Sequence, residues 1–122
     1  MNTAKKIVLA EDNSIFSLLL KFKLEKEGYK LLIAVNGKEA IELIEEHNPD
    51  MILTDIMMPF VSGLEVINHV RNKLSSSTPI VVFSSAGQEE MILNAFNLGA
   101  TDFMNKPFTP NELIMRTKRL FC

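Results

Sequence analysis

The sequence has no tryptophan, a single cysteine (Cys122) and no apolar run longer than a few residues. One cysteine cannot form an internal disulfide, which excludes a disulfide-stapled secreted scaffold and favours a reducing compartment. The short apolar runs exclude a membrane-spanning helix, which needs about 20 apolar residues, and the run at residues 7–10 is too short for a signal peptide. We therefore expect a cytoplasmic protein that does not associate with a membrane.

Excess charge of one sign is also lacking, because 13 Lys and Arg against 15 Asp and Glu leave a formal net charge of −2. Such a chain has no basic field to attract nucleic acid, so direct binding to nucleic acid is not expected. Hydrophobic residues make up 47% of the 122 residues, which is typical of a globular protein. The length favours one domain over residues 1–122, with a core that needs no staples.

Short apolar segments alternate along the chain with segments of helical period. Strands are expected at residues 7–10, 31–35, 51–54, 80–83 and 102–105. The helices between and after them have cap and stop signals: Ser14 with Gly28, Asn36 with Glu39, Ser62 with Glu65, Gly99, and Thr109 with Pro110 and Glu112. In the first helix, the residues expected to face the core are Phe16, Leu19, Leu20 and Leu24.

This alternation predicts a parallel sheet with helices on both faces and right-handed crossovers. The segments 7–10, 51–54 and 80–83 are continuous apolar runs, as expected of central strands that are covered twice. The other two strands are expected at the edges. The predicted fold is therefore α/β, a flavodoxin-like doubly wound (βα)5 architecture with a parallel five-stranded sheet in the order 2-1-3-4-5.

Polar residues follow four of the five predicted strands. Glu11 and Asp12 come after the first strand, Asp55 after the third, Ser84 after the fourth and Lys106 after the fifth. Each of these residues alone is an ordinary turn, cap or surface residue. Ligands of such sheets bind outside the carboxyl ends of the strands, where the strand order switches. The coincidence at successive strand ends therefore predicts one shared site.

Electrostatics indicates what this site would hold. Three carboxylates within a few ångströms repel one another and would take up protons unless a cation intervened. Lys106 offsets one of the three charges, and Mg²⁺ prefers a few carboxylates together with waters and a phosphate oxygen. A carboxylate can act as a nucleophile and form an aspartyl phosphate, and a lysine suits a phosphoryl oxygen. The cluster therefore predicts Mg²⁺-dependent phosphoryl chemistry.

These residues resemble the receiver domain of bacterial two-component response regulators, over about Lys5 to Leu120. Their order and spacing together are highly specific. The matching motifs are Glu11-Asp12, Thr54-Asp55-Ile56-Met57-Met58-Pro59 with Gly63, Pro79-Ile80-Val81-Val82-Phe83-Ser84-Ser85, and Gly99-Ala100 with Phe103 and Lys106-Pro107-Phe108.

The resemblance implies a role for each site residue. Asp55 would be the phosphoacceptor of a phosphorelay and would receive its phosphoryl group from a sensor histidine kinase or a phosphotransfer protein. Mg²⁺ would be held by Glu11, Asp12, Asp55 and the backbone carbonyl of Met57. Lys106 would pair with the phosphoryl group. These roles describe a regulator rather than an enzyme, with at most self-catalysed phosphoryl transfer and autodephosphorylation.

The resemblance also implies a switch. Ser84 would move toward the phosphoryl oxygen while Phe103 turns inward, and the bond before Pro107 would be cis. The surface of the fourth helix, fifth strand and fifth helix would then change and control a downstream protein target or output domain. The resemblance does not decide whether the same surface also forms a homodimer.

Two other classes of function compete with this interpretation. A pseudo-receiver would keep the fold and act only as a protein-binding module, which the full acid set with Lys106 argues against. A phosphatase with an aspartyl nucleophile would normally have a second acid where Met57 stands, and a flavin carrier would meet phosphate repulsion from Glu11 and Asp12.

Met57 and Ala86 flank the predicted site without offering hydrogen bonds to a hydrolytic water. We therefore expect slow autodephosphorylation, and the substitution Met57→Asn should accelerate loss of the phosphoryl group. The decay of the aspartyl phosphate, followed in both proteins, checks this expectation. A lifetime of seconds in the unsubstituted protein would contradict it.

Overall fold

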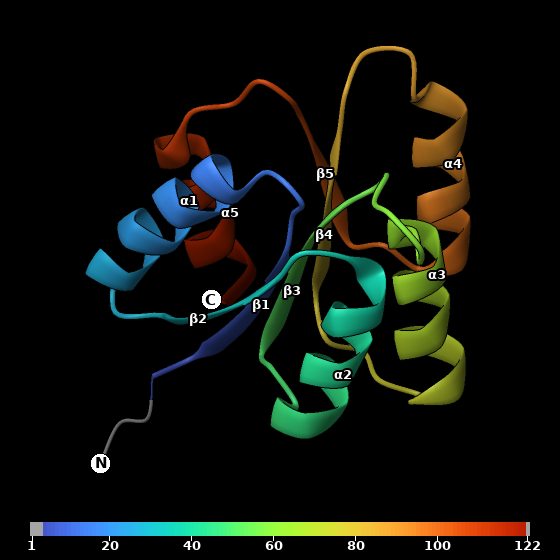
Figure 1. The fold of residues 1–122 in the computed structure, drawn as a ribbon, viewed down its shortest axis with the longest axis horizontal. Coiled ribbons are helices and arrows are strands. Elements are labelled where there is room, and N and C mark those ends of the chain that lie inside the picture. Colours follow the sequence, from blue (N-terminus) through green and yellow to red (C-terminus); the bar gives the residue numbers. More distant parts are fainter. Residues whose placement is uncertain (1–3, 122) are drawn as a thin grey trace.

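The structure, a computed structural model, describes residues 4–121, so Cys122 lies outside the described residues. Its centre is a parallel five-stranded sheet in the order β2-β1-β3-β4-β5 (Figure 1). The strands are β1 (Lys6–Ala10), β2 (Lys30–Ala34), β3 (Met51–Asp55), β4 (Ile80–Ser84) and β5 (Asp102–Asn105). The predicted flavodoxin-like fold and strand order are confirmed.

Helices cover both faces of the sheet. Figure 1 shows α1 and α5 on one side, and α2, α3 and α4 on the other. The helices are α1 (Ser14–Lys26), α2 (Gly37–His47), α3 (Gly63–Asn68), α4 (Glu89–Leu98) and α5 (Pro110–Phe121). None of the helices within residues 4–121 is long and apolar enough to cross a membrane.

The two faces of the sheet form two separate hydrophobic cores. Alternate side chains of β1 illustrate this division, because Val8 joins the core beneath α2, α3 and α4, whereas Leu9 joins the core beneath α1 and α5. All residues of β3 and β4 are buried. These continuous apolar strands were predicted to be central. They are central in the sheet, and helices cover them on both faces.

Side-chain caps begin most of the helices. The side-chain oxygens of three predicted cap residues accept hydrogen bonds from the backbone N–H three residues later: Asn36, Ser62 and Thr109. The first helix differs from the prediction, because its cap is Asn13, which accepts from Phe16 N at 3.0 Å, and Ser14 is already helical. Asn and Ser are almost equally good caps, so the sequence did not separate the two neighbours.

The predicted core face of α1 was partly wrong. Leu20 and Leu24 are fully buried with Ser17. These positions are spaced by three and four residues and form one stripe that faces the sheet. Leu19 lies outside the stripe, and this residue is 43% exposed.

The helix predicted to begin after Ser62 changes its period before it ends. The α-helix α3 continues into a π-helical turn, η1 (His69–Lys73). Within this turn, Arg71 donates hydrogen bonds to the carbonyl oxygens of Gly99 and Ser76, both at 2.9 Å. Arg71 therefore fastens the C-terminal end of α4 to the end of α3.

The turn that follows Asp55 lies against the start of α3 at a glycine. Gly63 N donates to the carbonyl oxygen of Ile56 at 3.0 Å. A Cβ atom at Gly63 would lie 2.4 Å from the carbonyl oxygen of Asp55 and 2.9 Å from Cα of Ile56. Only a residue without a side chain permits this approach of two backbone segments.

Substitution Gly63→Ala should therefore destabilise the protein. Because the added methyl group meets backbone rather than a flexible side chain, we expect the free energy of unfolding to fall by about 1–3 kcal/mol. Chemical denaturation monitored by circular dichroism measures this change. A variant as stable as the unsubstituted protein would show that the turn after Asp55 can move away freely.

Candidate functional site

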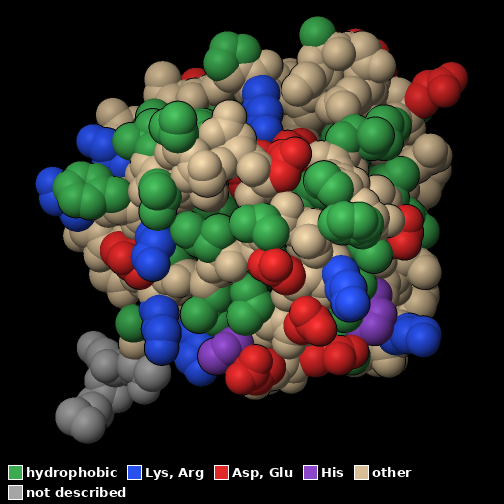
Figure 2. Space-filling view, viewed as in Figure 1, with side chains coloured by type: hydrophobic (Ala, Val, Ile, Leu, Met, Phe, Trp, Pro, Cys, Tyr) green, Lys and Arg blue, Asp and Glu red, His purple; other side chains and the backbone are tan. Residues whose placement is uncertain are grey.

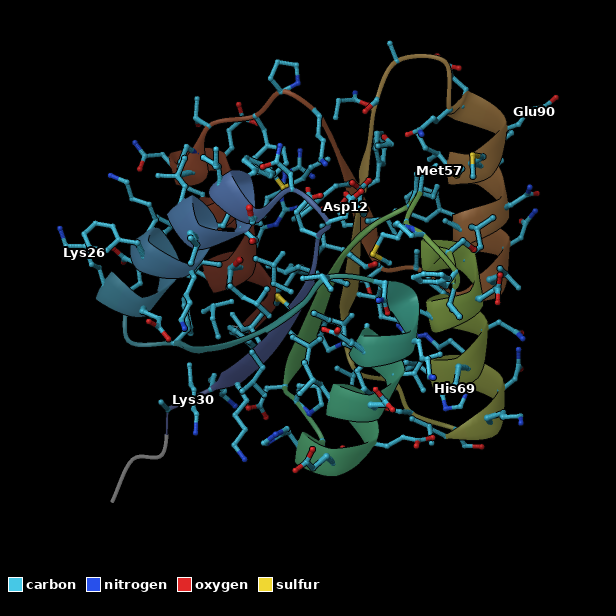
Figure 3. The ribbon with its side chains drawn as sticks, in the orientation of Figure 1. Asp12, Lys26, Lys30, Met57, His69 and Glu90 are labelled. Atoms are coloured by element: carbon cyan, nitrogen blue, oxygen red, sulfur yellow. The ribbon has the colours of Figure 1, made fainter. Side chains whose placement is uncertain are left out.

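The carboxyl ends of four strands bring the predicted polar residues to one edge of the sheet. Glu11 and Asp12 directly follow β1, Asp55 is the last residue of β3, Ser84 is the last of β4, and Lys106 directly follows β5. Figure 3 shows Asp12 at this edge. The parallel arrangement is the reason why residues so distant in sequence meet here.

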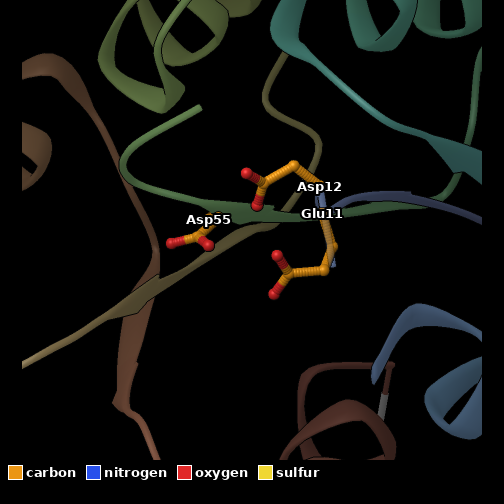
Figure 4. A group of neighbouring side chains, drawn as sticks. All are labelled: Glu11, Asp12 and Asp55. Atoms are coloured by element: carbon orange, nitrogen blue, oxygen red, sulfur yellow. The ribbon is translucent and has the colours of Figure 1, made fainter. Parts of the chain in front are cut away.

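The three acids form one compact cluster. A carboxylate oxygen from each of Glu11, Asp12 and Asp55 lies within 4.8 Å of the others (Figure 4). Glu11 and Asp55 are buried, whereas Asp12 is exposed. A set of oxygen ligands without sulfur or imidazole suits a hard cation such as Mg²⁺ or Ca²⁺. The cluster therefore could hold a divalent metal ion.

Lys106 joins the two buried acids. Its Nζ atom lies 2.5 Å from Oε1 of Glu11 and 2.7 Å from Oδ2 of Asp55. The second oxygen of Glu11 accepts a hydrogen bond from the backbone N–H of Asn13 at 3.2 Å. A buried carboxylate is unfavourable unless it is paired and hydrogen-bonded. These contacts satisfy that requirement for Glu11.

Burial and ion pairing shift the pKa values of Glu11 and Lys106 in opposite directions. Burial raises the pKa of Glu11, the hydrogen bond from Lys106 opposes this, and the nearby Asp55 carboxylate adds to the rise, so that the pKa lies above its usual value. For Lys106, burial lowers the pKa, but its hydrogen bonds to Asp55 and Glu11, together with the charges of these two acids, raise it more. Lys106 is therefore a cation at neutral pH.

Ser84 has a partner that the sequence analysis missed. Its side chain is fully buried, and its Oγ donates to Oδ1 of Asn105 at 3.3 Å. The two residues are directly paired across β4 and β5. The hydroxyl is thus engaged with the neighbouring strand. No pattern in the sequence identifies this pair, because it depends on the register between the strands.

The remaining predicted residues lie on β5 and in the segments that follow β3 and β5. Phe103 on β5 is half-buried, and its ring makes an edge contact with Phe96 of α4 at a centroid distance of 5.8 Å. Met57 lies in the turn two residues after Asp55, and this residue is 49% exposed. The Lys106–Pro107 peptide bond is cis.

Comparisons with known proteins agree with this fold. The family model described as the response regulator receiver domain matches residues 7–118. The transcriptional regulatory protein CrdR of Helicobacter pylori is 38% identical over 96% of this chain. That match covers 55% of CrdR, so the chain spans about half the length of this curated relative.

Solved structures of the same kind superpose closely. The receiver domain of the Francisella response regulator 1452 has a TM-score of 0.87 and 32% identity, and the match covers 96% of both chains. The chemotaxis response regulator CheY4 of Vibrio cholerae has a TM-score of 0.88 and 27% identity, with 96% of this chain and 98% of that chain covered. The chain belongs to the response regulator receiver domain family and is the receiver domain of a two-component response regulator.

Charge repulsion within the acidic cluster should lower the melting temperature of the metal-free protein. Substitution Asp12→Asn removes one of three clustered carboxylates, so we expect the metal-free protein to melt about 2–5 °C higher. Mg²⁺ should raise the melting temperature of the unsubstituted protein by binding its folded state, and should raise that of the variant less. Thermal unfolding without and with saturating Mg²⁺ measures both effects.

Glu90→Gln is the matched control, because Glu90 is an exposed acid on α4 that Figure 3 shows away from Asp12. This variant should gain no stability and should keep the full response to Mg²⁺. Equal behaviour of the two variants would contradict a cation site at the cluster.

Proposed function

We propose that this receiver domain is a phosphoacceptor switch of a two-component phosphorelay, in which Asp55 receives a phosphoryl group with the help of Mg²⁺. The observation that carries the proposal is the position of Lys106 Nζ, which bonds to both Glu11 and Asp55 inside a cluster of three acids. Residues 1–122 would form one such domain, which would act as a regulator rather than as an enzyme.

The transfer step follows from these groups. An oxygen of Asp55 forms a bond to the phosphorus atom of the donor while the bond from phosphorus to the donor nitrogen breaks, and the nitrogen keeps the electron pair. Lys106 turns toward a phosphoryl oxygen and balances its charge. When Mg²⁺ is bound by Glu11, Asp12, Asp55 and the carbonyl of Met57, it supplies the positive charge that three carboxylates and a phosphoryl group require.

The switch uses the residues of β4 and β5. The Ser84 hydroxyl leaves Asn105 and donates to a phosphoryl oxygen instead. The 3.3 Å distance between Ser84 and Asn105 supports this exchange, because it lies at the long end for a hydroxyl hydrogen bond. Phe103 then turns into the space that Ser84 vacates, which alters the surface of α4, β5 and α5. Both residues act through a shift between two existing arrangements.

Protein partners fit the exposed surface of α1. Ile15 and Leu18 of this helix are large apolar residues, and both are mostly exposed. Figure 2 shows hydrophobic and basic side chains together at the left of the view, over α1. Exposed apolar side chains that gather on one helix are typical of a protein-binding surface. The phosphoryl donor would be a sensor histidine kinase or a phosphotransfer protein. A downstream protein target, or a second copy of this chain, would bind the surface formed by α4, β5 and α5. All of these contacts would take place in the cytoplasm.

Beryllofluoride, which imitates a phosphoryl group on aspartate, tests the proposal. In the presence of Mg²⁺, we expect it to shift backbone NMR signals around Asp55, Ser84 and Lys106. The variant Asp55→Ala should lose the response completely, because the acceptor oxygen is gone.

Asp50→Ala provides the matched control, because Asp50 precedes β3 at the opposite end of the strand that carries Asp55. It should respond like the unsubstituted protein. An unsubstituted protein that ignores beryllofluoride at saturating Mg²⁺ would instead be a pseudo-receiver, and a response that survives in Asp55→Ala would move the acceptor elsewhere.

A further inference from the structure

An aromatic ring lies beside the ammonium group of the site lysine. Lys106 Nζ is 5.3 Å from the ring centroid of Phe16. Phe16 lies in the first turn of α1, where its backbone N–H is held by the cap residue Asn13. A cation within about 6 Å of an aromatic face is attracted by the negative charge of that face. The sequence pattern predicts Phe16 only as a residue of the hydrophobic core.

The orientation of this ring is determined by the core. Phe16 meets Phe108 edge to face, with centroids 5.4 Å apart and planes inclined by 64°. Phe108 in turn contacts Phe83, a fully buried residue of β4, at 4.9 Å. Contacts of this kind restrict the rings to a few arrangements. The ring beside Lys106 is thus the outer end of a row of three aromatic side chains that begins in the sheet.

Lys106 needs such support. Its side chain is long and flexible, and the two acids Glu11 and Asp55 attract the ammonium group without holding its carbon chain. The ring of Phe16 adds an attraction that does not depend on either acid. A groove at this place is lined by Asn13, Phe16, Ser85, Lys106, Pro107 and Phe108. Lys106 therefore lies between the acidic cluster and the aromatic rings of Phe16 and Phe108.

We propose that Phe16 is a positioning residue for Lys106, and that a cation–π contact holds the ammonium group where it meets the phosphoryl oxygen. The proposal rests on the function proposed above, because it assigns to Lys106 the role of pairing with that oxygen. When Lys106 releases Asp55 during phosphoryl transfer, the contact with Phe16 remains. The ring thus limits the disorder of the lysine in the phosphorylated state.

The same helix carries a natural control. Lys26 Nζ lies 5.0 Å from the ring centroid of Phe22, so the contact has the same chemistry. Phe22 is exposed, and Figure 3 shows Lys26 far from Asp12 and from the site edge. The variant Phe22→Leu therefore removes an equivalent ring from α1 without touching the site.

The first test uses the metal-free protein. A ring face shifts the NMR signals of nearby protons upfield, so we expect upfield signals for the side-chain methylene protons of Lys106. Phe16→Leu should remove the shift, Phe16→Tyr should retain it, and Phe22→Leu should not alter it. Thermal unfolding checks that each variant is folded. Unshifted Lys106 signals in the unsubstituted protein would overturn the contact itself.

The second test measures beryllofluoride affinity at saturating Mg²⁺. We expect Phe16→Leu to weaken the affinity about two- to tenfold, which is the range of a partly exposed cation–π contact. Phe16→Tyr should restore the affinity, and Phe22→Leu should match the unsubstituted protein. Mg²⁺ affinity, titrated separately, should be the same in all four proteins, because the ring contacts the lysine and not the acids.

The outcomes separate the two proposals. If the unsubstituted protein does not bind beryllofluoride, the proposed function fails, and the Lys106 signals alone decide whether the ring holds the lysine. If it binds, and Phe16→Leu binds equally well, the positioning role is overturned while the function stands. A loss of affinity that Phe16→Tyr does not restore would also overturn it, since the ring would then matter only for its fit in the core.

Discussion

The interaction on which the whole site depends is the pair of ion pairs that Lys106 forms with Glu11 and Asp55. Glu11 is completely buried, and a buried carboxylate without a cation would be protonated or would destabilise the fold. The lysine lies 95 residues from one acid and 51 from the other, so this pairing exists only when β1, β3 and β5 are in place. One ammonium group cannot balance three carboxylates. The remaining negative charge gives the pocket its suitability for a divalent cation and, with that cation, for a phosphoryl group.

The rest of the structure holds these charges at a short, defined spacing. The central strands are covered on both faces, so their carboxyl ends cannot separate without exposing two hydrophobic cores. Gly63 lets the start of α3 lie directly against the backbone at the end of β3. The row from Phe83 through Phe108 to Phe16 extends the core to the edge of the site. Hydrophobic burial thereby provides the stability that a cluster of like charges removes.

The two ends of α4 are held differently. At its C-terminal end, Arg71 donates to the carbonyl oxygen of Gly99, which ties the helix to α3. Before its N-terminal end, the backbone N–H of Ser85 donates to the side chain of Gln88 at 2.6 Å, one residue after Ser84. A rearrangement at Ser84 would therefore reach α4 at the end nearest the site, while the far end stays fastened. This asymmetry supports the proposed switch, whose response would appear on α4 and β5.

The sequence by itself determined the strand order, the central and edge strands, most helix caps and the group of residues at the strand ends. It could do so because apolar periodicity and cap chemistry are local properties, and because parallel strands must present their carboxyl ends at one edge. Only the tertiary structure decided the cap at Asn13, the exposure of Leu19, the pairing of Ser84 with Asn105 and the ring of Phe16 beside Lys106. The last three depend on the direction of one side chain relative to another element. That direction is set by register and core contacts between distant segments, which no local pattern contains.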